Sequence, residues 1–149
     1  MAMKFNSIEE VKGYLTQVKP LAMSIMYLRS KRKEVEETLK VTASYSERVQ
    51  SGSVGSSVEE YAIKLAELKQ EIIQGEAERQ ELIRDIEATI DRFVPRERVF
   101  HNRTAVVLKM KYLNGMTNSA VAKRIGLSLK QVKRILNKGY EQLLKNAIE

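Results

Sequence analysis

The sequence predicts an all-α protein, built as a long coiled-coil-like N-terminal helical hairpin followed by a C-terminal domain of three helices. Apolar residues recur at helical spacing through most of the 149 residues, and Ser or Thr stands at several positions where a helix needs an N-cap. Aromatic residues make up only 6% and Trp is absent, which is typical of aliphatic packing between helices. We divide the chain into a hairpin (residues 1–94), a basic connector (95–103) and a three-helix domain (104–149).

The first long helix is predicted to begin at a capping box formed by Ser7 and Glu10, in which each side chain bonds a free amide of the first turn. Apolar residues then continue at helical spacing as far as Leu39. Pro20 removes one amide and crowds the preceding turn, so it should kink this helix or split it. Residues 42–57 are rich in Ser and Gly and lack periodicity, which predicts a flexible loop.

The second long helix is predicted to begin at another capping box, headed by Ser57. Its apolar residues follow a spacing close to 3.5 residues over 58–93, the pattern of a coiled-coil seam, with interruptions at Gly75 and Arg79. Two long helices joined by one loop fold back most simply as an antiparallel hairpin. The pattern leaves open whether this seam packs within one chain or joins two chains in a homodimer.

Two features of the helices have both a functional and a structural interpretation, and we favour the structural one. The basic cluster at residues 28–37 is expected to be an exposed helical turn whose Lys and Arg pair with Glu four positions on, rather than a second contact to nucleic acid or polymerase. Met23, Met26 and Met110 stand among apolar positions and are expected to fill gaps in the core.

The C-terminal domain shows three further helical segments after Pro95, which should end the second long helix. Thr104 is a candidate N-cap for a helix that runs to residue 114, and Gly115 should end it.

A short helix and a third helix follow. Thr117 should cap the short helix, Gly126 should end it in the left-handed conformation, and Ser128 should cap the third helix. Their apolar residues would face each other across the turn, with Ala122 allowing close approach. Gly139 either permits close packing of the third helix or bends its end. A short helix, a tight turn with Gly and a second helix make the spacing of a helix-turn-helix.

Charge is distributed very unevenly along the chain. Residues 95–149 contain 12 Lys and Arg against 3 Asp and Glu, a net charge of +9, whereas residues 1–94 contain 14 against 16, a net charge of −2. A basic half joined to a near-neutral half indicates a polyanionic partner for the basic half, and double-stranded DNA is the partner we expect. The outward residues of the third helix are Lys130, Gln131, Lys133, Arg134, Asn137 and Lys138.

The segment VVLKMKYLNGMTNSAVAKRIGLSLKQVKRILNKGYEQLL, residues 106–144, resembles region 4 of sigma-70-type factors, the part that reads the −35 promoter element. The resemblance implies DNA-base contacts by Ser128, Leu129, Lys130, Gln131 and Arg134. It implies DNA-phosphate contacts by Lys111, Thr117, Lys123, Arg124, Lys133 and Lys138. Leu129 stands where the sigma pattern usually has a polar or basic residue, so it either touches a thymine methyl group or packs inward. The housekeeping −35 sequence is therefore not assumed as the target.

The whole chain is similar to phage-encoded late-gene regulators of the ArpU/RinA type, which combine a charged helical hairpin, a Ser/Gly loop and a terminal region-4-like helix-turn-helix. This resemblance implies a phage or prophage of Gram-positive bacteria and activation of late operons through promoter DNA. The aromatic helix of sigma region 2 is missing, which argues against a stand-alone sigma factor. A phage small terminase subunit that recognises packaging-site DNA, and a protein that binds RNA polymerase or a sigma factor with little DNA binding, are the alternatives.

Enzymatic activity is not expected, because the sequence has no nucleotide-binding loop, no nucleophile motif and no cluster of metal ligands. The single His, His101, stands beside Asn and Arg in the connector, where a solvent-exposed or phosphate-side role is the common one. We predict no catalytic residue, metal or cofactor. No Cys and no apolar run of about 20 residues occur. The expectation is a soluble protein of the bacterial cytoplasm without a membrane partner.

Overall fold

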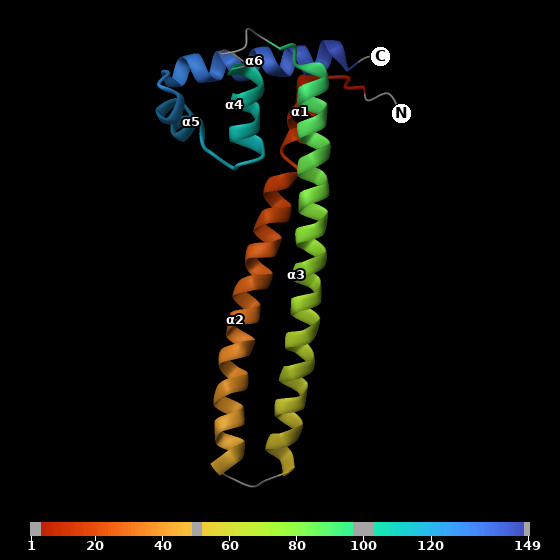
Figure 1. Cartoon of the computed structure of the whole chain (residues 1–149), viewed down its shortest axis with the longest axis vertical. Coiled ribbons are helices and arrows are strands. Elements are labelled where there is room, and N and C mark those ends of the chain that lie inside the picture. The colour runs from red at the N-terminus through yellow and green to blue at the C-terminus, as the bar shows by residue number, and fades with distance from the viewer. Residues whose placement is uncertain (1–3, 49–51, 97–102, 148–149) are drawn as a thin grey trace. The chain divides into compact units, whose positions relative to one another are not determined.

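The computed structural model describes residues 4–48, 52–96 and 103–147, and all regular structure within these residues is α-helical (Figure 1). The helices are α1 (Ile8–Leu15), α2 (Val18–Arg48), α3 (Gly52–Phe93), α4 (Arg103–Tyr112), α5 (Asn118–Ile125) and α6 (Leu129–Asn146). The prediction of an all-α protein is therefore confirmed for these residues. None of the helices they form is both long enough and apolar enough to span a membrane.

The chain divides into two compact units, and the division differs from the boundary that we predicted at residue 94. One unit, here called the terminal unit, comprises residues 1–20 and 80–149; the other, here called the central unit, comprises residues 21–79. The difference arises because α1 and the last turns of α3 bury their apolar residues in one cluster with α4, α5 and α6. A sequence boundary drawn at Pro95 separates segments that share this core.

Helix α1 begins and ends where short-range signals place it. The Ser7 hydroxyl accepts the Glu10 amide at 3.2 Å, while the Glu10 carboxylate accepts the amide of Asn6 at 2.7 Å, one residue earlier than in a standard capping box. The helix stops at Leu15 and α2 starts at Val18, so Pro20 lies in the first turn of α2, where a helix does not need its amide. Of the two effects predicted for this proline, the split is the one observed.

The prediction of a Ser/Gly loop at residues 42–57 is wrong: the residues of this range that the structure describes are helical. Helix α2 continues to Arg48 and α3 already begins at Gly52, so Ser57 lies inside α3 and is not an N-cap. Extending an existing helix costs little per residue, because each added residue contributes one hydrogen bond. Thr42 and Ala43 are also half-buried, which favours the longer helix. The remaining residues of the predicted loop, 49–51, lie outside the described residues.

In the central unit α2 and α3 run side by side in opposite directions (Figure 1). The most deeply buried apolar residues of this pair lie on the seams predicted from the spacing; they are Ile25, Val35, Leu68 and Ile72. Gly75, which interrupts the seam in the sequence, lies where a β-carbon would come within 3.1 Å of Cγ1 of Ile25. The interruption therefore makes room for a large side chain of the opposite helix.

The basic cluster at residues 28–37 is ion-paired, as the structural interpretation predicted. Lys31 lies 3.7 Å from Glu34 and Arg32 lies 3.8 Å from Glu36 along α2, and Arg29 forms an ion pair with Glu76 of α3. Exposed pairs of this kind contribute at most about 1 kcal/mol each. The cluster therefore offers little uncompensated charge to a nucleic acid.

The methionines do not all fill the core as predicted. Met110 packs against the core of the terminal unit, but Met23 and Met26 are 60% and 66% exposed, with Tyr27 beside them at 66%. A pair of helices has only one buried seam, so apolar residues on the outer face of α2 have nothing in the described chain to pack against. This outer face of α2 is an unpaired apolar surface of the central unit.

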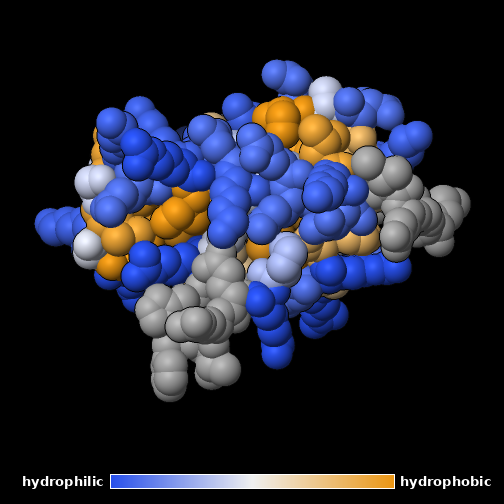
Figure 2. Space-filling view, turned by 90° about the horizontal axis from the view of Figure 1, so that it is seen from above, coloured by the Kyte–Doolittle hydropathy of each residue, from blue (hydrophilic) through white to orange (hydrophobic). Residues whose placement is uncertain are grey.

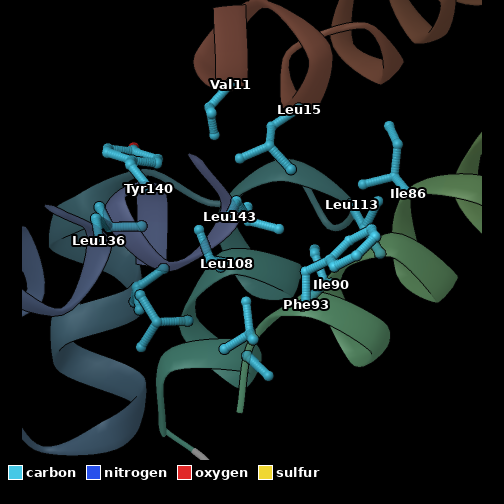
Figure 3. Packing of buried hydrophobic residues seen from close by; sticks show 14 of the residues in the cluster. Val11, Leu15, Ile86, Ile90, Phe93, Leu108, Leu113, Leu136, Tyr140 and Leu143 are labelled. Atoms are coloured by element: carbon cyan, nitrogen blue, oxygen red, sulfur yellow. The ribbon is translucent and has the colours of Figure 1, made fainter. Parts of the chain in front are cut away.

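The core of the terminal unit is built around one face of α6 (Figure 3). Leu143 and Leu108 are fully buried at its centre, where α6 meets α4. Val11 and Leu15 reach this centre from α1, and Ile86 and Ile90 reach it from α3. The end of α3 is also tied to α6, because the side-chain amide of Asn146 donates a hydrogen bond to the carbonyl of Phe93 at 2.7 Å.

Helix α4 begins earlier than predicted. Thr104 lies inside α4, with only 1% of its surface exposed, so it is not the N-cap; the residues before Arg103 lie outside the described part of the chain. The helix ends at Tyr112, two residues before the predicted end, and Gly115 lies three residues further on with a φ of 68°. Pro95 follows the end of α3 at Phe93, as predicted.

The contact between α6 and α4 depends on the absence of a side chain at Gly139. A β-carbon there would lie 2.8 Å from Cδ1 of Leu108 and 3.1 Å from Cγ2 of Thr104. At these distances a β-carbon would force either the Leu108 side chain or the two helices to shift. Of the two roles that the sequence allowed for Gly139, close helix packing is therefore the one observed.

We predict that Gly139→Ala destabilises the terminal unit by about 1–3 kcal/mol through overpacking, although Ala is the better helix former by about 1 kcal/mol. The measurement is the urea midpoint of unfolding followed by circular dichroism. Gly13→Ala is the matched control, since nothing lies within 4 Å of a β-carbon at this position in α1, and it should be neutral or stabilising. Equal effects of the two substitutions would contradict the assignment.

Candidate nucleic-acid interface

The turn between α5 and α6 is fixed by Gly126. Its φ of 71° and ψ of 34° place it in the left-handed region, where its amide and that of Leu127 both donate to the carbonyl of Ala122. The bond from Leu127 measures 3.0 Å. A residue with a β-carbon would be strained in this conformation. The turn therefore has a defined geometry, which sets the direction in which α6 leaves α5.

Both helices begin at the N-caps that the sequence predicted. The Thr117 hydroxyl accepts the amide of Ala120 at 3.1 Å, at the start of α5. At the start of α6 the Ser128 hydroxyl accepts the amide of Gln131 at 3.2 Å, and the side-chain oxygen of Gln131 accepts the amide of Ser128 at 2.9 Å. This reciprocal pair is a complete capping box, so the first turn of α6 is held in place before any ligand binds.

The capping box limits what Gln131 can offer to a base. A bidentate pair with adenine needs both the oxygen and the NH₂ group of the amide, and the oxygen of Gln131 is already bonded to the Ser128 backbone. Only its NH₂ group remains for a ligand unless the cap opens. The predicted base contact by Gln131 is therefore restricted to donation.

Helix α6 has two distinct faces. Its buried face consists of Val132, Leu136, Gly139, Tyr140 and Leu143. All the residues predicted to contact a base are exposed: Ser128, Leu129, Lys130, Gln131 and Arg134. Lys130, Gln131 and Arg134 point away from the buried face, whereas Ser128 and Leu129, four and three residues before Val132, are in line with it at the start of the helix. Leu129 is 42% exposed, so its side chain is partly open to solvent and partly covered. Figure 2 shows the molecule from the side of α6, where hydrophilic residues cover much of the centre of the view.

The residues predicted to contact phosphates differ in how exposed they are. Thr117, Lys123, Arg124, Lys133 and Lys138 are exposed. Lys111 is half-buried, and its ammonium group donates to the side-chain oxygen of Asn118 at 2.7 Å. The hydroxyl of Thr117 serves the α5 cap, so its oxygen already accepts a bond from the chain.

Almost nothing neutralises the charge of this region. Residues 103–147 contain ten Lys and Arg but a single acidic residue, Glu141. Among the described residues, Lys109 has an ion-pair partner, Asp91 of α3 at 2.6 Å, whereas Lys123, Arg124, Lys130, Lys133 and Arg134 have no carboxylate within 4 Å. Exposed cations without counter-charges form the electrostatic footprint of a protein that binds a polyanion.

A pair of tyrosines joins α4 to α6 beside this basic surface. The hydroxyls of Tyr112 and Tyr140 share a hydrogen bond, and their ring centroids lie 6.3 Å apart. Lys12 of α1 places its ammonium nitrogen 5.2 Å from the centre of the Tyr140 ring, a cation–π distance. The contact between Lys12 and Tyr140 was not predicted, because Lys12 lies more than a hundred residues before Tyr140, in a segment of near-neutral charge.

The structure bears on the predicted absence of a metal site only through the His, Asp and Glu residues that it describes. No group of three or more His, Asp or Glu there is placed to hold a metal ion. His101 lies outside these residues. The expectation of a non-enzymatic protein without metal or cofactor remains a prediction.

Comparison with known proteins adds no relative: no family model matches the chain, and no curated protein or solved structure matches it either.

The tyrosine pair makes the stability of the terminal unit sensitive to alkaline pH. Burial, and next the hydrogen bond to Tyr140, raise the pKa of Tyr112 far above its ordinary value, and burial also raises the pKa of Tyr140. In the unfolded chain a tyrosine ionises near pH 10. A raised pKa in the folded state means that the stabilisation is complete below about pH 10 and is lost as the pH rises above it.

We therefore predict that the urea midpoint of the protein falls steeply as the pH rises above about 10, and that Tyr112→Phe makes this fall shallower. Near-ultraviolet absorbance would follow tyrosine ionisation in parallel. Tyr27→Phe is the control, because Tyr27 is 66% exposed and makes no such pair. If the two variants show the same pH dependence as each other, the hydrogen-bonded pair is not responsible.

Proposed function

We propose that the protein is a sequence-specific DNA-binding transcriptional regulator without enzymatic activity. In this proposal α5, the Gly126 turn and α6 form a helix-turn-helix like that of sigma-70 region 4, with α4 as its supporting helix. The first turns of α6 enter the major groove and α5 crosses the phosphate backbone. The observation that carries the proposal is the exposed face of α6, which combines a pre-formed N-terminal cap with Lys130, Lys133 and Arg134 free of carboxylate partners.

The chemistry of that face suits base recognition. Lys130 and Arg134 are one helical turn apart, and either can donate to the O6 and N7 edge of guanine. Leu129 presents an exposed aliphatic group beside them, which suits the methyl group of thymine. We propose Ser128 and Gln131 as further base contacts, the latter through its NH₂ group.

Phosphate contacts are proposed for the flanking residues. They are Lys111, Thr117, Lys123, Arg124, Lys133 and Lys138, the same set that the resemblance implies. If about six cations of the interface met phosphates, the logarithm of the binding constant would fall with the logarithm of salt concentration with a slope near about −5.

The biological setting follows from the resemblance to phage late-gene regulators. We propose activation of late genes of a phage or prophage from promoter DNA, within the cytoplasm of the bacterial host. The antiparallel pair α2–α3 would then be a coiled-coil-like hairpin for self-association or for a contact to RNA polymerase. The exposed Met23, Met26 and Tyr27 on its outer face support self-association.

The test of DNA binding is a titration of duplex fragments from the genomic neighbourhood of the gene, at several salt concentrations. We expect one fragment to bind more tightly than the rest, with a steep salt dependence. Lys130→Ala and Arg134→Ala should each reduce the preference for that fragment by about 1–3 kcal/mol. Lys145→Ala, at the far end of the same helix, is the matched control and should keep the preference.

The outcomes of this titration separate the alternatives. A preferred fragment upstream of late genes supports the regulator, whereas one at a packaging site, bound by a ring-shaped oligomer, supports a small terminase subunit. Weak and equal binding of all fragments, unchanged in the two α6 variants, contradicts both. Retention of an RNA polymerase or sigma-factor contact in those variants would then indicate an interaction protein.

Self-association is tested separately by sedimentation equilibrium. We predict that the protein is a homodimer and that Met26→Glu with Tyr27→Glu shifts it to a monomer, because charges on the outer face of α2 would have to be buried in the interface. Ala62→Glu places a charge on an exposed position of α3 and should leave the dimer intact. A monomeric wild-type protein at all concentrations would refute this part of the proposal.

A further inference from the structure

A second group of lysines lies next to the proposed helix-turn-helix, and half of it comes from the beginning of the chain. Lys12 belongs to α1 and Lys19 to the first turn of α2, and both are exposed residues of the terminal unit. Packing of α1 against α6 brings Lys12 to Tyr140, with 5.2 Å between its nitrogen and the ring centroid. The N-terminal segment therefore adds charge directly to the basic surface formed by α4 and α6.

Lys111 lies against the other ring of the same tyrosine pair. Its ammonium nitrogen lies 5.6 Å from the centre of the Tyr112 ring and donates to Asn118, the first residue of α5. Tyr112 is in turn hydrogen-bonded to Tyr140. Lys12 and Lys111 thus border one rigid aromatic platform, and Lys111 links this platform to the start of α5.

The electrostatics indicate that these lysines act on one another. Partial burial lowers the pKa of Lys111, and repulsion from Lys12, Lys133 and Lys19, in that order, lowers it further. None of these four lysines has a carboxylate within 4 Å among the described residues. Bringing uncompensated cations together costs free energy, which an anion bound between them would offset.

We propose that Lys12 and Lys19, together with Lys111 and Lys133, form a phosphate-binding patch that extends the DNA contact from the helix-turn-helix onto the N-terminal segment. This inference rests on the proposed DNA binding. Helix α5 is the helix that crosses the backbone in such motifs, and Lys111 is bonded to its first residue, so the patch lies where the DNA backbone would continue. The N-terminal segment thereby contributes affinity and not sequence preference.

The experiment measures the salt dependence of duplex DNA binding for the wild-type chain and for a double variant that carries Lys12→Gln and Lys19→Gln. Lys145→Gln, the same substitution in the last turn of α6, is the control. Each lost phosphate contact should reduce the slope by about 0.9, so the double variant should lose about two. Its ratio of affinities for preferred and unrelated fragments should stay unchanged. The control should keep the wild-type slope.

Lys12→Arg with Lys19→Arg keeps the charge and should restore the wild-type slope, which separates a phosphate contact from damage to the packing of α1. An unchanged slope in the Gln double variant overturns the patch while leaving the helix-turn-helix proposal intact. No salt-dependent binding by the wild-type chain overturns both. If the Gln double variant keeps the wild-type slope for DNA but no longer binds polyglutamate, which the wild-type chain binds, the lysines belong to a site for an acidic protein partner.

Discussion

The buried face of α6 is the constraint on which the terminal unit depends. Four segments pack against this one helix, and at Gly139 even a methyl group would lie 2.8 Å from Leu108 unless something shifted. Because α6 is fixed from behind by α4 and from the side by α1, its opposite face points outward in one orientation. The basic residues that we propose to meet DNA are therefore positioned by hydrophobic packing, while their own side chains remain solvated.

Much of this arrangement could be predicted from local sequence, because its causes are local. Thr117 and Ser128 are N-caps and Gly126 is a left-handed stop for reasons contained within a few residues. The two faces of α6 follow from the spacing of its apolar residues. Two of the predictions that failed, a loop at residues 42–57 and an N-cap at Thr104, depended on composition or on a single residue type, and the helices continue through such weak signals.

The contacts of Lys12 could not be predicted in this way. Its partner Tyr140 lies in another helix more than a hundred residues along the chain, and the chain carries no local signal that α1 packs on α6. The same holds for the ammonium of Lys111 and its bond to Asn118. The sequence therefore identified the exposed face of α6 as a candidate site, whereas the surface beside it became visible only through tertiary packing. The same holds for Gln131. Its side-chain oxygen is bonded to the Ser128 amide and so is not free for a base, which the residue type alone does not reveal.

The division of the terminal unit between the two ends of the chain has a consequence for biosynthesis. Val11 and Leu15 leave the ribosome well before Leu143, with which they share one buried core. The central unit, whose partners lie close together around one reversal of the chain, can pair while synthesis continues. The terminal unit cannot form until α6 has been made, and it then closes a loop of more than a hundred residues. Its folding depends on contacts of high sequence separation, so we expect the proposed DNA-binding surface to mature after the central unit.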